Sequence, residues 1–160
     1  MTFEDFLIDV DPKYLGFVRE NHDDLIRKGC TLKMATAKNG YVISYYYGKK
    51  KRVLVNFVFR NGELVARIYS GNVDQYISVL DTLPEDMKKI VKKSPKCKRF
   101  EDPPKCSPKC IGYTFTFDAE HHQKCRYSCF LFKVTDESIP VIKDMTDKEL
   151  SCRIEAENKK

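Results

Sequence analysis

Five of the seven cysteines in this chain of 160 residues lie within residues 97–129. Their spacing is C-x8-C-x3-C-x14-C-x3-C, and prolines at 103, 104 and 108 predict a turn-rich loop between the first three cysteines. Four thiolates complete the tetrahedral coordination that a structural zinc ion prefers. The spacing therefore predicts a structural zinc site formed by Cys97, Cys106, Cys110 and Cys125.

The choice of Cys125 over Cys129 depends on the secondary structure expected around them. If residues 127–134 form a strand that begins near position 124, the two cysteines lie about 13 Å apart at roughly 3.3 Å per residue. One ion cannot bind both thiols at that separation, whereas a helical turn would bring positions i and i+4 to the same face. Cys129, His121 and His122 are therefore kept as alternative ligands, and exposed loop histidines are the simpler interpretation of the His pair.

Basic residues adjoin most of these thiols, and four thiolates around zinc carry a net negative charge. Neighbouring cations favour the thiolate over the thiol and partly neutralise the centre. Cys30 and Cys152 lie far from the cluster in sequence, so we expect them to be dispensable for the metal. The adjoining cations are Lys96, Lys98, Lys105, Lys109, Lys124 and Arg126.

The same region has a second interpretation as a nucleic-acid interface. Residues 88–110 hold nine Lys or Arg against Glu101 and Asp102, enough to account for the whole net charge of +6. Lysines neutralise phosphates, and aromatic side chains such as Tyr113 and Tyr127 could stack on bases. Known nucleic-acid motifs are missing, so only weak binding is expected. The residues predicted for such an interface are Lys88, Lys89, Lys92, Lys93, Lys96, Lys98 and Arg99.

A thiol redox enzyme is a further alternative, because cysteines near lysines have a lowered pKa and are nucleophilic when exposed. The chain lacks the C-x-x-C motif and the βαβ setting of thioredoxin-like proteins. A dyad of Cys125 or Cys129 with a neighbouring histidine is disfavoured, because neighbours in sequence rarely form one. Gly-rich phosphate loops and the H-E-x-x-H motif are also missing. The sequence favours a binding or regulatory module, with a small ligand or a protein as its partner.

Composition indicates a globular protein. Hydrophobic residues make up 42% and charged residues 32% of the chain, and 160 residues suit one domain. We expect neither a signal peptide nor a membrane span, because the N-terminus has no basic n-region and no apolar segment reaches about 18 residues. We therefore expect a cytoplasmic protein. Thiols stay reduced in the cytoplasm, so clustered cysteines there indicate a metal site or a redox site and not a set of disulfides. We predict a single domain, 1–160, with a cysteine-rich insertion at 95–129.

The first half of the chain predicts two helices and an antiparallel β-meander. Thr2 with Asp5 is a capping pair, and Asp11-Pro12 opens a helix over residues 12–28. Gly29 supplies its C-terminal stop. The predicted strands are 32–37, 41–47, 52–60 and 63–69, with Asn39-Gly40 and Asn61-Gly62 as type I′ turns.

The second half predicts helices on either side of the cysteine loop. Capping patterns at Asn72 with Gln75 and at Thr82 with Glu85 open two helices, and Ser94-Pro95 ends the second. Residues 113–117 and 127–134 predict a hairpin connected by residues 118–123, and a last helix is predicted at about 138–155. The expected fold is α+β: an antiparallel β-meander flanked by helices, with a cysteine-rich metal-binding loop and a C-terminal β-hairpin plus helix.

The chain contains the segments FEDFLIDVDP and GYVISYYYGKKKRVLVNFVFRNGELVARIY and the pattern SPKCKRFEDPPKC-x3-C…GY…F…KCRY. Together these resemble a small family of cytosolic proteins from Firmicutes, chiefly clostridial, over nearly the whole chain. The resemblance implies a bacterial cytosolic setting and makes the cysteine stretch the family's hallmark, without naming a reaction. The helix–meander–helix half is also similar to the YdhG-like and YjbR-like small α+β domains.

Overall fold

The computed structural model describes residues 1–110 and 112–159. Its helices, with η for 3₁₀, are α1 (Phe3–Leu7), η1 (Pro12–Tyr14), α2 (Leu15–Arg27), η2 (Val73–Thr82), α3 (Glu85–Lys93), η3 (Lys98–Phe100) and α4 (Ile139–Asn158). Its strands are β1 (Thr31–Ala37), β2 (Gly40–Tyr47), β3 (Arg52–Arg60), β4 (Glu63–Ile68), β5 (Tyr113–Phe117), β6 (Glu120–Lys124) and β7 (Leu131–Lys133).

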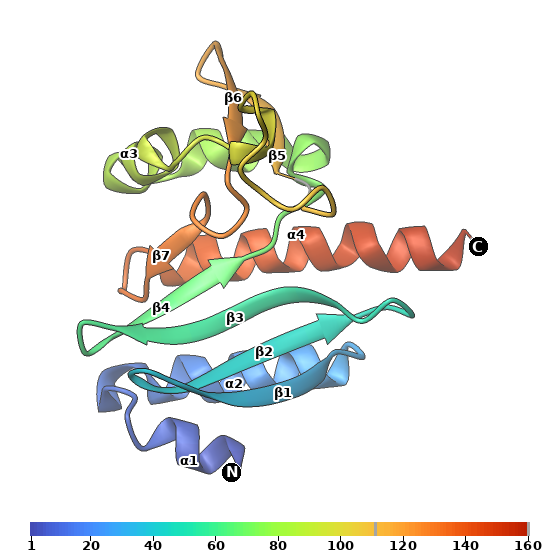
Figure 1. Ribbon diagram of the computed structural model, residues 1–160. Coiled ribbons are helices and arrows are strands. Elements are labelled where there is room, and N and C mark those ends of the chain that lie inside the picture. The colour runs from blue at the N-terminus through green and yellow to red at the C-terminus, as the bar shows by residue number, and fades with distance from the viewer. Residues whose placement is uncertain (111, 160) are drawn as a thin grey trace.

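The strands form two sheets. Five pair antiparallel in the order β1-β2-β3-β4-β7, and β5 pairs with β6 in a separate hairpin. Helices α2 and α4 lie behind the larger sheet, and the hairpin stands beyond its β7 side with α3 (Figure 1). The fold is α+β, as the sequence predicts. Among the described residues, no helix combines the length and the apolar character needed to cross a membrane.

Local signals at the N-terminus form the predicted caps. The Asp5 carboxylate accepts from the Thr2 amide (2.6 Å), and the Asp5 amide donates to the Thr2 hydroxyl (3.3 Å). Gly29 has a φ of +96° after the end of α2, which explains the stop. His22 of α2 stacks on Phe3 at 3.9 Å between ring centroids, and its Nδ1 lies 2.9 Å from the Tyr45 hydroxyl. These contacts join α1 and α2 to β2.

One of the two predicted type I′ turns is confirmed. Asn61 and Gly62 both have positive φ, at +53° and +76°, and connect β3 to β4. The Asn39-Gly40 prediction is wrong in register, because Gly40 already pairs with Ala37 as the first residue of β2. The loop there consists of residues 38 and 39.

The third strand lies in the middle of the larger sheet, as its apolar sequence predicts. Residues 54–57 are all buried. Phe57 faces the helices and meets Phe17 of α2 at 6.1 Å between ring centroids. Asn56 points to the opposite face, where its amide donates to the Tyr69 hydroxyl (3.3 Å).

Two predicted helix caps are replaced by other contacts. The Asn72 side chain makes no cap bond to η2, because its amide donates to Glu149 of α4 instead. Helix α3 begins after Pro84, and the Thr82 hydroxyl donates to the Val79 carbonyl (2.7 Å). Ile90 of α3 is 39% exposed, whereas Met87 and Val91 of the same helix are buried.

The second hairpin differs most from the prediction. Its second strand is β6, which lies in the segment expected to be a connection, and the turn is Asp118-Ala119, both with positive φ. Of the predicted strand 127–134, only β7 is extended, and it pairs with β4. Sequence reasoning missed β6 because its inward-facing residues, His122 and Lys124, are polar and do not give an alternating apolar pattern. Their burial depends on partners that are distant in sequence.

Helix α4 carries a fully buried carboxylate. Glu149 accepts hydrogen bonds from the Asn72 amide (2.9 Å) and side chain (2.8 Å), from the Tyr76 hydroxyl (2.8 Å) and from Arg153 Nε (3.0 Å). The Arg153 guanidinium also donates to the carbonyls of Arg52, Val53 and Tyr69. This ion pair joins α4 to the ends of β3 and β4 and to the start of η2.

We predict that Glu149→Ala lowers the free energy of unfolding by about 3–5 kcal/mol, because it leaves the Arg153 charge without its partner. Urea unfolding followed by circular dichroism measures the loss. Glu155→Ala, the same change at an exposed position of α4, is the control and should stay within about 0.5 kcal/mol of the parent. Equal losses in both variants would contradict the role assigned to Glu149.

Candidate metal centre and adjoining cleft

Cys97 and Cys125 belong to two segments that pair antiparallel beside β6. The Cys97 amide donates to the Gln123 carbonyl (3.0 Å), and the Cys125 amide donates to the Pro95 carbonyl (2.9 Å), around an isolated β-bridge. Side chains alternate between the faces of paired strands, so both cysteines point to the face opposite the bridge residues. They are diagonal neighbours on that face, a relation in which Cα atoms lie roughly 7–8 Å apart.

The loop between Cys97 and Cys110 is closed by its own hydrogen bonds. The Lys105 amide donates to the Lys98 carbonyl (3.0 Å), so the residues next to Cys106 and Cys97 lie side by side. The Arg99 guanidinium donates to the Cys110 carbonyl (3.2 Å). These bonds bring the two ends of the loop together.

The Cys110 thiol titrates under the influence of two other predicted ligands. Burial raises its pKa, the neighbouring thiols of Cys106 and Cys97 raise it further, and Arg126 opposes them. Three predicted ligands therefore lie in one neighbourhood, and the strand pairing adds Cys125 to it.

These thiols do not already form a coordination shell. Within residues 1–110 and 112–159, no three His, Cys, Asp or Glu side chains converge closely enough to hold a metal ion. Cys97 and Cys110 are buried, Cys125 is half-buried and Cys106 is exposed on the loop. The structure brings the four thiols to one region without closing a tetrahedron around one point.

Gly112 allows the chain to pass directly over Cys97. A Cβ atom at this position would overlap the Cys97 Sγ and would lie 3.0 Å from the Lys124 carbonyl oxygen. Only glycine fits such an approach without moving its neighbours. Sequence reasoning missed this contact, because a glycine between a loop and a strand gives no sign of the thiol beneath it.

The predicted separation of Cys125 and Cys129 is wrong. The Cys129 amide donates to the Cys125 carbonyl (3.0 Å), which makes residues 125–129 a turn of helical type instead of an extended strand. The distance argument against Cys129 therefore does not hold. Burial distinguishes Cys125 from Cys129: Cys129 is fully buried within the hydrophobic core, whereas Cys125 is half-buried and lies outside that core. Burial raises the pKa of Cys129 to about 12.

The two alternative histidine ligands lie apart from the thiols. His122 is buried on the inner face of β6, with its ring 5.4 Å from that of Phe115 between centroids. His121 points to the outer face, as Cys125 does, but it lies four residues earlier on an extended segment, or about 13 Å away. For the same reasons, neither histidine is placed to form a catalytic dyad with Cys125.

The basic segment is partly neutralised by the protein itself. Lys88 pairs with Glu85, Lys92 with Asp118 and Lys105 with Glu101. The aromatic side chains Tyr113, Phe115 and Phe117 are buried and cannot stack on bases. Five members of the predicted nucleic-acid interface remain exposed: Lys89, Lys93, Lys96, Lys98 and Arg99.

Lys124 has a different role from the one its sequence position suggests. Its Nζ is buried and donates to the carbonyls of Lys92 (2.6 Å) and Ser94 (2.8 Å) at the C-terminal end of α3. A cation there interacts favourably with the helix dipole. Lys124 therefore holds α3 against β6 and points away from the cysteine side of the strand.

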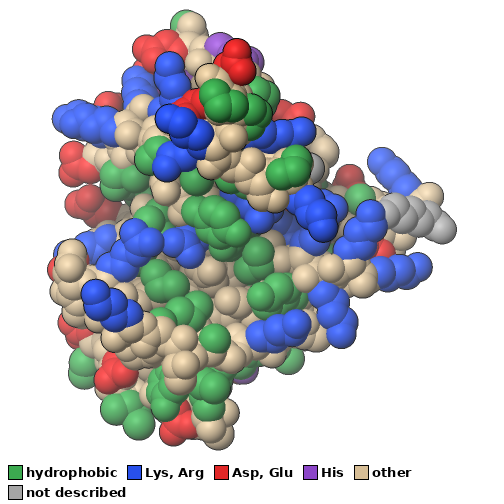
Figure 2. Space-filling view, viewed as in Figure 1, with side chains coloured by type: hydrophobic (Ala, Val, Ile, Leu, Met, Phe, Trp, Pro, Cys, Tyr) green, Lys and Arg blue, Asp and Glu red, His purple; other side chains and the backbone are tan. Residues whose placement is uncertain are grey.

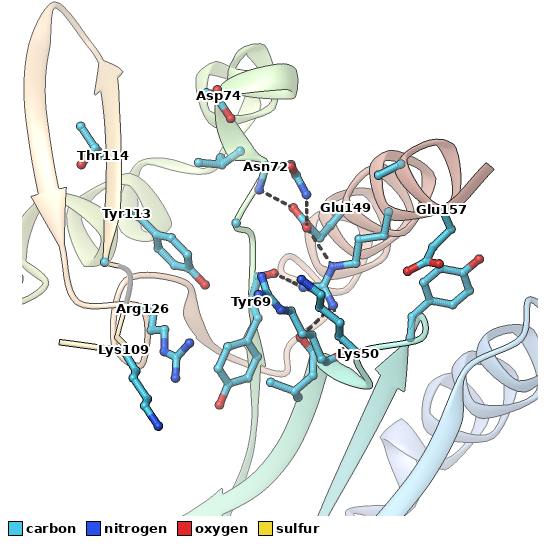
Figure 3. Close-up of a pocket in the computed structure, with 18 residues that line it drawn as sticks. Lys50, Tyr69, Asn72, Asp74, Lys109, Tyr113, Thr114, Arg126, Glu149 and Glu157 are labelled. Atoms are coloured by element: carbon cyan, nitrogen blue, oxygen red, sulfur yellow. Dashed lines mark hydrogen bonds and ion pairs between the residues drawn. The ribbon is translucent and has the colours of Figure 1, made fainter. Parts of the chain in front are cut away.

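A cleft of about 640 Å³ adjoins the cysteine segment. Its walls come from the β2–β3 turn, the β4–η2 connection, the segment from Lys109 to Arg126, and α4. Figure 2 shows Lys and Arg side chains gathered beside this hollow, between the hairpin and the larger sheet. The buried Glu149 and its partner Arg153 are among the residues that line the cleft, and Figure 3 shows Glu149 on α4 next to Asn72. The spacing i, i+4 of that pair on a helix was the one local signal for it in the sequence.

We predict that thiol reactivity follows burial. At pH 8, with metal removed by a chelator, iodoacetamide should modify exposed Cys106 first. Cys129 should react last, because a pKa of about 12 leaves about a thousandfold less thiolate than an ordinary thiol has. Cys30 is the matched buried control, since burial raises its pKa to about 11. Mass spectrometry of the alkylated peptides over time measures the order, and early modification of Cys129 would contradict its enclosed position.

Comparison of the chain with protein-family models, with curated proteins and with solved structures found no match in any of the three. The resemblance to clostridial proteins stays a prediction. The function is therefore argued from the cysteine segment and the cleft themselves.

Proposed function

We propose that the protein is a non-catalytic binding module in which Cys97, Cys106, Cys110 and Cys125 hold a structural zinc ion. The observation that carries the proposal is the antiparallel pairing that directs Cys97 and Cys125 to the same face beside β6. The closed loop supplies Cys106 and Cys110 to the same region. Exposed Cys106 must turn toward the other three thiols to complete the tetrahedron.

The exposure of the loop supports a structural role for the metal. Residues 98–109 are all exposed, and even Phe100 is 55% exposed, so no apolar side chain in this segment anchors it to the core. Ordering a loop costs about 1–2 kcal/mol of backbone entropy per residue, which hydrophobic contacts here do not offset. A zinc ion bound to four thiolates would offset it, because the binding energy of a structural metal is part of the folding energy.

Binding is favoured over catalysis by the surroundings of the thiols. The buried His122 is enclosed by aromatic rings on the other side of β6, and His121 lies about 13 Å along the strand from Cys125, so neither of these two histidines is placed to act as its general base. The proposal includes a cytoplasmic setting, where thiols remain reduced and available to zinc. The cleft beside the cysteine segment is the surface on which a binding module would act.

Removing one ligand tests the metal. We expect Cys106→Ser and Cys110→Ser each to reduce bound zinc, measured by plasma mass spectrometry on purified protein, from one equivalent to well below one. The free energy of unfolding should fall by about 3 kcal/mol, the stabilisation given by a ligand present at about a hundredfold above its Kd. Cys152→Ser, a half-buried cysteine on α4, is the control and should keep its zinc. Unchanged zinc content in both loop variants would refute the site.

The fourth ligand is tested by alanine at each end of the 125–129 turn. Cys125→Ala should lose the metal. Cys129→Ala should keep it and lower the free energy of unfolding by about 1 kcal/mol, because it leaves only a small void in the core. Zinc analysis of the two purified variants distinguishes them. Loss of zinc from Cys129→Ala alone would move the fourth ligand to Cys129.

A further inference from the structure

The cleft has an excess of positive charge that the protein does not neutralise. One of its cations, Arg153, is fully used by Glu149 and three backbone carbonyls. The other charged side chains lining the cleft form no ion pair within the described residues. They are the cations Lys50, Arg52, Lys109 and Arg126 and the carboxylates Asp74 and Glu157.

Within residues 1–110 and 112–159, the Arg126 guanidinium makes one hydrogen bond. Its Nη2 donates to the Tyr127 hydroxyl (3.2 Å), and its guanidinium carbon lies 5.0 Å from the centroid of that ring. Its Nε is buried and has no hydrogen-bond partner in the part of the chain that the structure describes. A guanidinium has five N–H donors, and leaving them unpaired is unfavourable. An acceptor bound in the cleft would supply partners that the protein lacks.

Tyr113 adds a neutral donor on the same wall. Its ring is buried against Phe130, at 5.5 Å between centroids, and burial raises its pKa, so the hydroxyl stays protonated. Figure 3 shows this hydroxyl and the Arg126 guanidinium directed toward the space beside Tyr69, with Lys109 next to them. The wall formed by the cysteine segment therefore carries three side chains that can donate hydrogen bonds: Arg126, Lys109 and Tyr113.

We infer that the cleft binds a phosphorylated small molecule, with the phosphate held by Arg126, Lys109 and Tyr113. This inference rests on the proposed function as a binding module and names its ligand. Four unpaired cations against two carboxylates leave two positive charges, which match the nearly double negative charge of a phosphate monoester at neutral pH. Arg and Lys with a neutral donor are the groups that recognise phosphate oxygens.

The size of the cleft indicates an organic ligand. A volume of about 640 Å³ lies in the range of small-molecule sites and greatly exceeds one phosphate ion. Lys50 on the β2–β3 turn and Arg52 at the start of β3 provide further positive charge in the cleft. Asp74 and Glu157 provide acceptors for ligand hydroxyl or amino groups.

The binding experiment compares phosphorylated probes with their matched neutral forms. The purified protein, with the metal it retains, is titrated by calorimetry at low salt with adenosine 5′-monophosphate and ribose 5-phosphate, and then with adenosine and ribose. We expect the phosphorylated probe of either pair to bind at least about tenfold more tightly than its neutral form, because charge-assisted hydrogen bonds need the phosphate. Equal binding within both pairs would overturn the inference.

Variants locate the site. Arg126→Gln should weaken binding of the tighter phosphorylated probe by about 10- to 100-fold, the loss of hydrogen bonds to a charged group. Arg52, at the start of β3, lies far from the cysteines in sequence, and Arg52→Gln should weaken binding of the same probe by about three- to tenfold through the loss of one charge. Lys89→Gln, an exposed position of α3 outside the cleft, is the matched control and should change nothing. A loss in Lys89→Gln equal to that in Arg126→Gln would contradict the assignment.

Further measurements distinguish this inference from the zinc proposal and from nucleic-acid binding. Protein that contains no zinc yet binds the phosphorylated probes would sustain the cleft and refute the metal proposal. Zinc-loaded protein that binds none of the probes would overturn the inference while the metal proposal stands. A single-stranded oligonucleotide that binds when the small phosphates do not would also overturn it, in favour of the exposed lysines of α3.

Discussion

The arrangement of the two halves of the fold depends on the hydrogen bonds and the ion pair made by the buried carboxylate of Glu149. Burying a carboxylate costs several kcal/mol unless its oxygens are satisfied, and four donors from η2, its N-cap Asn72 and α4 satisfy them here. Arg153 then extends the network to the carbonyls at the ends of β3 and β4. Because this network also lines the cleft, the same bonds that dock α4 fix the shape of the candidate binding site.

The first half of the fold could be predicted because its signals are local. Thr2 with Asp5 satisfies its own helix end, Asn61-Gly62 adopts the two positive φ values of its turn, and β3 is apolar enough to demand a central position. The second half could not, because its signals depend on distant partners. His122 and Lys124 are buried in β6, one against the Phe115 ring and the other on the carbonyls that end α3. Without these partners the segment has the composition of a loop.

Part of the candidate site could likewise be predicted from the sequence, and part of it could not. The cysteines were recognisable by residue type, and their grouping follows from a loop that closes on itself between Lys98 and Lys105. The argument for Cys125 over Cys129 was wrong, because it assumed an extended strand at residues 125–129, where the chain makes a helical turn. The cleft was invisible in the sequence, since its lining comes from four separated segments and its central pair, Glu149 and Arg153, looks like an ordinary surface pair on a helix.

The cysteine segment connects the two proposals physically. Lys109 and Arg126 line the cleft, and each adjoins a predicted ligand, Cys110 or Cys125. A metal that fixes those two cysteines would also fix the backbone that carries the two cations, and holding donors in place reduces the entropy that a ligand must overcome on binding. Coupling of this kind is reciprocal. A phosphate bound between Lys109 and Arg126 would order the same loop from the other side, and it would raise the affinity of the thiols for zinc by the factor by which zinc raises the affinity for phosphate.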